Sequence, residues 1–260
     1  MTYPKEYSKK TYIDWHNKNV EASVNIEHEI ESLIEEIKST SQARLNHLAV
    51  LLDRIHSFHL LAMRSKKEDI SDAETKIQLA DKLAGSDYDS LFKTTDSIFD
   101  KLWRKNKDRD ESNYITTKDI KNHFGDLVRT SIVTSTFSYA EHLATSISLW
   151  KDLIRNLQVK PDDYNDIESI RTQQEAKMEN GYFAYHLDVL YTDGLRVEVQ
   201  IYSRLSEVWR SLSHKLYEKV RIGEDVTWGH GAAPSRLVSL GHLLHLAECE
   251  VQYLKEVITK

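Results

Sequence analysis

Between residues 180 and 219, two segments alternate between polar and apolar residues as β-strands do. Their polar residues are of types that are seldom found together. Side chains alternate along a strand, so each segment has one apolar and one polar face. The polar face collects a phenol, an imidazole, two carboxylates and an amide: Tyr182, His186, Asp188, Glu198 and Gln200. A solvated face is the common alternative for an antiparallel sheet, but it would more often carry lysine, threonine and glutamate. We therefore predict a binding or catalytic face.

The turn between these two segments decides which polar residues meet. Asp193-Gly194 is a hairpin signal. A two-residue turn would mix polar and apolar side chains on one face, whereas a three-residue loop over 192–194, with the glycine left-handed, keeps them apart. The pairs predicted for the three-residue loop are Asp188 with Glu198 and His186 with Gln200.

Two further segments carry charged groups suited to phosphate or metal. Residues 91–105 predict a helix with Lys93, Ser97 and Lys101 close to one face, and such a stripe suits a polyphosphate because charge-assisted contacts to phosphate are strong. A solvated lysine-rich face is the usual alternative. Asp126 enters a β-branched run, which indicates an acid at the start of a central strand; a turn or N-cap aspartate is the commoner alternative.

The composition limits the class of protein. The chain has 260 residues and a net charge of −6, so wholesale nucleic-acid binding is not indicated. A single cysteine, Cys249, excludes an internal disulfide framework and a cysteine-based zinc site. No apolar run is long enough to span a membrane, and the polar N-terminus does not have the features of a signal peptide. We expect a soluble, cytoplasmic protein.

The elements that must position these residues are mainly helical. Apolar periodicity predicts two helices within residues 11–84, a third helix after a capping box at Ser71–Glu74, another after a capping box at Ser138–Glu141, and a closing helix over 235–258. A glycine-rich bend at 228–231 is interpreted as a connector.

The expected fold is α+β: a mixed β-sheet of about five strands flanked by helices, with helical N- and C-terminal extensions. The predicted division is a helical N-terminal region (1–85), a central domain (86–225) and a C-terminal helix packed on it (226–260).

Several motifs resemble the synthetase domain of the RelA/SpoT family. They are Gly181-Tyr182-x-x-x-His186, Glu198-Val199-Gln200-Ile201, and then Trp209 and His214. The likeness spans roughly Lys93 to Lys219. In size, and in lacking a hydrolase metal signature, the chain is similar to the small alarmone synthetases. The resemblance implies a nucleotidyltransferase-like synthetase fold and transfer of pyrophosphate from ATP to the ribose 3′-hydroxyl of GDP or GTP, the alarmone synthesis of the stringent response.

The same resemblance implies the roles of individual residues. Asp126 and Glu198 would hold Mg²⁺, and Glu198 would also accept the proton of the attacking hydroxyl. Tyr182 would stack on the acceptor base and His186 would contact a phosphate. The remaining residues of the implied nucleotide site are Lys93, Ser97, Lys101, Arg129, Gln200, His214 and Lys219. Residues 163–179 stand where the family has a mobile substrate loop.

Four positions depart from the family pattern. Leu91 and Ser131 stand where the family has two arginines that sandwich the adenine of ATP, although Arg129 shares a strand face with Ser131. Tyr202 replaces an arginine and Ser213 a glutamate. Other residues then hold the donor, the donor differs, or the activity is reduced.

Three functions stay open at this point. The first is a pyrophosphokinase acting on a guanosine nucleotide. The second is a toxic small synthetase that modifies the 3′ end of tRNA, with an antitoxin partner and a local basic patch. The third is a degenerate, non-catalytic binding module; a homo-oligomer is compatible with each. The patch needed for tRNA would consist of Lys10, Arg104, Lys105, Lys107 and Arg109.

Overall fold

The sheet at the centre of the molecule has five strands in the order β1-β2-β5-β4-β3. The structure, a computed structural model, describes residues 2–22, 24–67, 70, 73–177, 181–221 and 233–258. Strands β2 and β5 are parallel, and the other neighbouring pairs are antiparallel. The predicted α+β class is confirmed. The strands are β1 (Thr75–Ile77), β2 (Val128–Thr134), β3 (Ile167–Lys177), β4 (Tyr182–Tyr191) and β5 (Arg196–Ser203).

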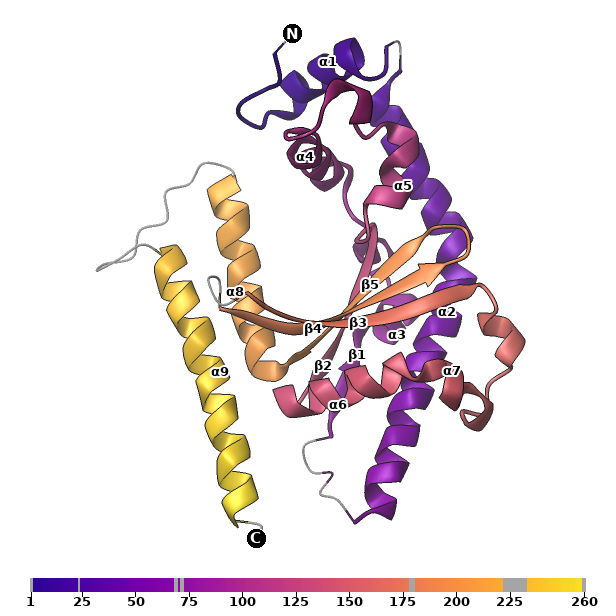
Figure 1. Ribbon diagram of the computed structural model, residues 1–260, viewed down its shortest axis with the longest axis vertical. Helices are drawn as coiled ribbons and strands as arrows, with labels where there is room; N and C mark the ends of the chain where they lie inside the picture. Colours follow the sequence, from indigo (N-terminus) through magenta and orange to yellow (C-terminus); the bar gives the residue numbers. More distant parts are fainter. Residues whose placement is uncertain are drawn as a thin grey trace.

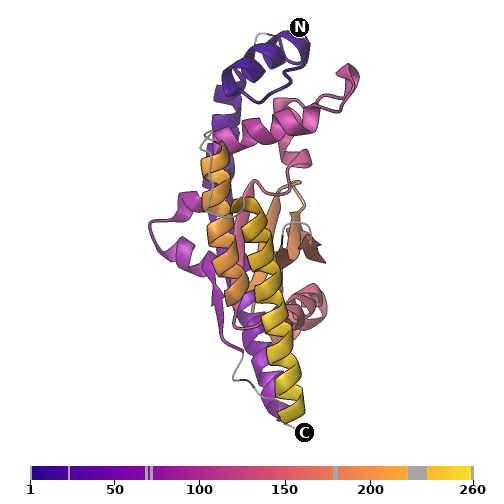
Figure 2. The same cartoon turned by 90° about the vertical axis from the view of Figure 1, so that its left-hand side faces the viewer.

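Helices cover both faces of this curved sheet. Figure 1 shows α4 and α8 over its concave side and α6 under its convex side, with the two chain ends at opposite ends of the molecule. Figure 2 shows α8 and α9 side by side. The helices are α1 (Lys9–Asn19), α2 (Ile26–Ser65), α3 (Gln78–Ala84), α4 (Thr95–Asn106), α5 (Ile120–His123), α6 (Phe137–Ser148), α7 (Trp150–Leu153), α8 (Arg204–Arg221) and α9 (Ala233–Ile258). Within the described ranges, none of them is both apolar and long enough for a bilayer.

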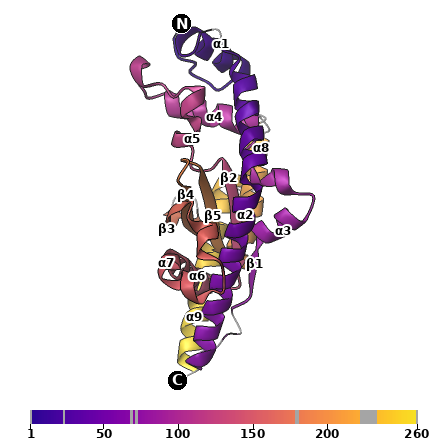
Figure 3. The ribbon, with the colours of Figure 1, turned by 90° about the vertical axis from the view of Figure 1, so that its right-hand side faces the viewer.

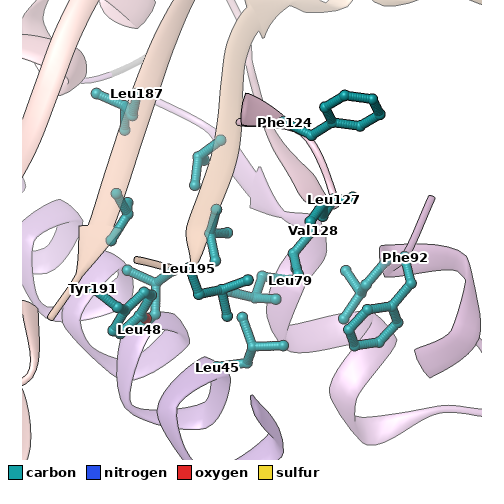
Figure 4. Packing of buried hydrophobic residues seen from close by; sticks show 14 of the residues in the cluster. Leu45, Leu48, Leu79, Phe92, Phe124, Leu127, Val128, Leu187, Tyr191 and Leu195 are labelled. Atoms are coloured by element: carbon teal, nitrogen blue, oxygen red, sulfur yellow. The ribbon is translucent and has the colours of Figure 1, made fainter. Parts of the chain in front are cut away.

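Helix α2 runs along most of the molecule (Figure 3). The prediction of two helices here is wrong, because the polar run at residues 39–41 does not interrupt the helix. Thr40 donates its hydroxyl to the carbonyl of Glu36 at 2.8 Å, so the hydroxyl is satisfied within the helix. Figure 4 shows Leu45 and Leu48 of α2 packed beside Tyr191 at the end of β4. Such burial stabilises the fold by roughly 1.5–3 kcal/mol for each large apolar side chain.

Two strands lie where helix or loop was predicted. β1 lies within the region predicted as helical and pairs with β2 at the edge of the sheet. β3 occupies most of the segment predicted as a mobile loop, and its main chain pairs with β4 along its length. The polar sequence of β3 fits an edge strand with a solvated face.

The capping predictions are partly corrected. The cap of α6 is Thr136, two residues before the predicted one; its hydroxyl accepts from the backbone N–H of Tyr139 at 3.2 Å. Ser71 and Asp72 of the other predicted box, and the bend at 228–231, lie outside the described residues. The closing helix is present as α9.

The predicted register of the β4–β5 hairpin is confirmed. Asp188 pairs with Glu198 and His186 with Gln200. The backbone N–H of Tyr191 donates to the carbonyl of Leu195 at 2.9 Å, which leaves the three loop residues between them. Gly194 has φ +83°, a left-handed conformation that suits glycine. The hairpin therefore presents the predicted polar set on one face.

Two glycines bring α9 against the start of β4. Gly181 has φ +68°, and a Cβ on it would lie 2.7 Å from the carbonyl oxygen of Val238. A Cβ on Gly241 would collide with the backbone of Gly181. The indole N–H of Trp209 in α8 donates to the carbonyl of Leu237 at 2.7 Å. Helix α9 is thus fixed to both β4 and α8 by backbone contacts.

Candidate functional site

Asp126 lies between two lysines at the entrance to β2. Its Oδ2 accepts from Lys93 Nζ at 2.9 Å and its Oδ1 from Lys101 Nζ at 2.5 Å. The backbone N–H of Lys93 also donates to the carbonyl of Leu127 at 2.9 Å, which ties this residue to the strand. The structure therefore brings together three of the predicted site residues.

The helix that carries the lysines begins later than predicted. α4 starts at Thr95, so Lys93 precedes it and the expected i, i+4, i+8 stripe is wrong. Thr94 caps the helix by accepting from the backbone N–H of Ser97 at 3.3 Å, and its hydroxyl donates to that of Ser97 at 2.9 Å. Ser97 thus takes part in the N-terminal cap of α4, one turn before Lys101.

Charge pairing overcomes burial at Asp126. Burial raises the pKa of its carboxyl, but the attraction of Lys93 and Lys101 is stronger and lowers the pKa to about 2. Burial lowers the pKa of Lys93, and Asp126 opposes that shift. The carboxylate is therefore ionised at neutral pH.

This low pKa makes stability depend on pH. Asp126 has a pKa of about 2 in the folded chain against an ordinary 3.8, so its contribution to the free energy of unfolding is complete above about pH 4 and is lost as pH falls toward 2. We expect Asp126→Asn to destabilise the chain by about 2 kcal/mol at pH 7 and by much less near pH 2. Denaturant unfolding at both pH values measures this, and a difference independent of pH would contradict it.

The second group of site residues lies on the hairpin. Glu198 accepts a short hydrogen bond from the side-chain amide of Gln200, and its Oε1 lies 3.7 Å from His186 Nδ1. The other ring nitrogen of His186 shares a hydrogen bond of 2.7 Å with the hydroxyl of Tyr182. The Tyr182 ring lies 5.9 Å from that of Trp209. The register thus links these predicted residues into one chain of contacts.

Arg129 lies between the two groups. It is paired with Glu198 across the parallel β2–β5 ladder and its side chain is exposed. Burial lowers the pKa of Lys93 most, and the charges of Lys101 and then Arg129 lower it further. Glu198 is therefore on β5, opposite Arg129 on β2, and Asp126 lies three residues before Arg129.

Arg210 on α8 joins this site although no role was predicted for it. Its guanidinium lies over the Tyr202 ring, 4.9 Å from the centroid, and donates a short hydrogen bond to Gln200 Oε1. Its Nε donates to His214 Nε2 at 3.3 Å. The signal in the sequence is the one-turn spacing of Arg210 from His214, which places the two on one helix face.

Comparisons with known proteins address the family resemblance. YwaC, a GTP pyrophosphokinase of Bacillus subtilis strain 168, is 31% identical over 138 residues, which are 50% of this chain and 57% of that protein. The chain thus matches little more than half the length of this relative. The resemblance to RelA/SpoT-type synthetases is confirmed. No protein-family model matches the chain.

Solved structures extend the likeness to the fold. A GTP pyrophosphokinase family protein from Streptococcus pneumoniae superposes with a TM-score of 0.51 at 16% identity, over 86% of this chain and 93% of that one. The small alarmone synthetase 1 of Bacillus subtilis gives a TM-score of 0.43 at 19% identity, over 65% of this chain and 77% of that one. The former likeness supports the synthetase fold.

The structure also locates the departures from the family pattern. Leu91 is completely buried in the core, so the leucine side chain itself does not reach a ligand. Ser131 is buried and its Oγ accepts from the Tyr202 hydroxyl at 3.0 Å, so these two departures contact each other. Ser213 and Lys219 lie on α8, and Lys219 is more than one turn beyond His214.

Proposed function

We propose that this chain is a RelA/SpoT-type pyrophosphokinase that transfers pyrophosphate from ATP to the ribose 3′-hydroxyl of GDP or GTP. The observation that carries the proposal is that Asp126, held by two lysines, lies two residues before β2, while Glu198, held by Gln200, is on the parallel neighbouring strand β5. The named activity of YwaC supports the same reaction.

The reaction needs little from the protein beyond charge and position. The 3′-hydroxyl oxygen would attack the β-phosphorus of ATP, the bond from that phosphorus to the α–β bridging oxygen would break, and AMP would leave. Glu198 would take the hydroxyl proton. Its side chain is partly exposed, and the Gln200 amide fixes one oxygen while the other is available to the acceptor.

The lysine pair would neutralise the triphosphate of the donor. Lys93 and Lys101 both form ion pairs with Asp126, and a bound triphosphate would give both ammonium groups further oxygen partners. Charge-assisted contacts to phosphate are strong enough for this exchange. It would also free the Asp126 carboxylate to act as an oxygen ligand.

The donor set fits Mg²⁺, which prefers oxygen ligands and is often held by one or two carboxylates and substrate phosphates. Asp126 is ionised at neutral pH, and Glu198 is on the neighbouring strand. Among the described residues no group of three or more histidine, cysteine or acidic side chains is placed to hold a metal, so phosphate oxygens and water would complete the coordination. When bound, Mg²⁺ would offset negative charge on the transferred group.

The test is an incubation of the purified chain with γ-labelled ATP and Mg²⁺, in parallel with GDP, GTP, no acceptor and bulk tRNA. We expect label to move to a guanosine nucleotide product that carries the 3′-pyrophosphate. Label on tRNA instead would replace the proposed acceptor with an RNA end. Label that stays in ATP in every lane, with the chain folded, would overturn the proposal.

A further inference from the structure

Arg210 presents a planar cation that is already fixed in place. One face of the guanidinium lies over the Tyr202 ring at 4.9 Å, and its edges donate to Gln200 and His214. The residue is only partly buried. A guanidinium is planar and stacks on aromatic rings, and holding one face against a tyrosine leaves the opposite face for another flat ring.

This platform lies at the far end of β2 from the lysine pair. The hydroxyl of Tyr202 donates to Ser131, and Ser131 is paired with Gln200 across the ladder. Ser131 is five positions after Asp126 along the chain, and β2 begins between them at Val128. A nucleoside triphosphate with its phosphates at Lys93 and Lys101 would run along β2 and bring its base to this platform.

The surroundings of Arg210 are positively charged. Gln78 on α3 donates to Glu207 on α8 at 3.4 Å, and Lys82 and Arg210 follow one turn along each helix. Burial lowers the pKa of Lys82, and the charges of Arg129 and Arg210 lower it further while Asp87 opposes them. Within the described part of the chain, none of these three cations forms a salt bridge with a carboxylate.

We propose that Arg210 binds the purine base of the donor nucleotide by stacking, with Tyr202 supporting its opposite face. The inference rests on the proposed function and makes it more specific. Neither Leu91 nor Ser131 supplies a guanidinium, and Arg210 supplies one from α8 instead.

The experiment compares a non-hydrolysable ATP analogue with inorganic tripolyphosphate by titration calorimetry in the presence of Mg²⁺. Arg210→Ala should bind the analogue about 2- to 30-fold more weakly, which is the range of one cation–π contact, and should bind tripolyphosphate as the wild type does. Arg210→Lys should recover only part of the lost affinity, because an ammonium group keeps the charge but has no plane to stack. Arg204→Ala is the matched control: it removes the same charge from the start of α8, where Arg204 pairs with Glu74 at 2.8 Å.

Each outcome decides a different claim. An analogue affinity in Arg210→Ala equal to that of the wild type overturns the role of Arg210 alone and leaves the proposed function intact. An equal loss for tripolyphosphate makes Arg210 a phosphate contact and also overturns stacking. A wild-type chain that neither binds the analogue nor forms product overturns the proposed function and this inference together.

Discussion

Glu198→Gln should lower kcat by about 10²- to 10⁴-fold, the usual contribution of a positioned general base. Glutamine keeps the size of the side chain and an oxygen that can accept from Gln200, so the fold and the strand pairing should persist. Because the lysine pair and Tyr182 are untouched, nucleotide affinity should change much less than kcat. Steady-state kinetics together with calorimetric binding of an ATP analogue separates the two effects.

Asp188→Asn supplies the control for this substitution. Asp188 is paired with Glu198 across the hairpin and lies on the same face, and its charge is met by Arg196 at 3.6 Å near the surface. The chemical change is identical, but we assign Asp188 no part in the reaction. A similar loss of kcat in both variants would mean that the negative charge of this face matters, rather than proton transfer at Glu198.

Asp126→Asn should abolish most of the activity and also destabilise the chain. An amide cannot balance Lys93 and Lys101 or serve as an anionic ligand, so we expect kcat to fall about 10²- to 10³-fold, as for the loss of one preorganised electrostatic contact. The depressed pKa corresponds to about 2 kcal/mol of stability at neutral pH. Activity should be measured at a temperature where both proteins are fully folded, as shown by circular dichroism.

Asp193→Asn is the control that separates a loss of stability from a loss of catalysis. Asp193 forms ion pairs with Lys121 at 2.9 Å and Arg44 at 3.0 Å, in the hairpin loop. Its removal should lower stability without changing kcat, because the loop is at the other end of β4 from Tyr182. If Asp193→Asn lowered activity as much as Asp126→Asn, reduced stability would explain both and the role of Asp126 would be wrong.

The hairpin could be predicted because its two faces differ strongly in polarity. A shift of one residue would have moved Val197 and Val199 to the polar side, so the sequence admitted only one register. That register places Glu198, Gln200 and His186 together on the evidence of the sequence alone. Asp126 was recognisable for a similar reason, because it immediately precedes a buried β-branched strand.

Other parts of the site were not recognisable because tertiary contacts decide them. β1 has only three residues, too few for a periodic pattern, and it forms by pairing with β2. Lys93 reaches Asp126 from outside the helix to which it was assigned. Lys82 comes near enough to Arg210 for the arginine to lower its pKa only through the tertiary fold, and no spacing in the sequence indicates that approach.

The contact between Gly181 and Gly241 has an evolutionary consequence. Neither position can gain a side chain unless the two backbones move apart, so a substitution at one is not rescued by a change of side chain at the other. Tyr182 follows Gly181 directly, so α9 contacts the chain immediately before this residue of the proposed site. The close contact with Gly181, next to Tyr182 of the proposed acceptor site, therefore limits which residues α9 can carry at position 241. In homologues of this chain, the two glycines should be kept or lost together.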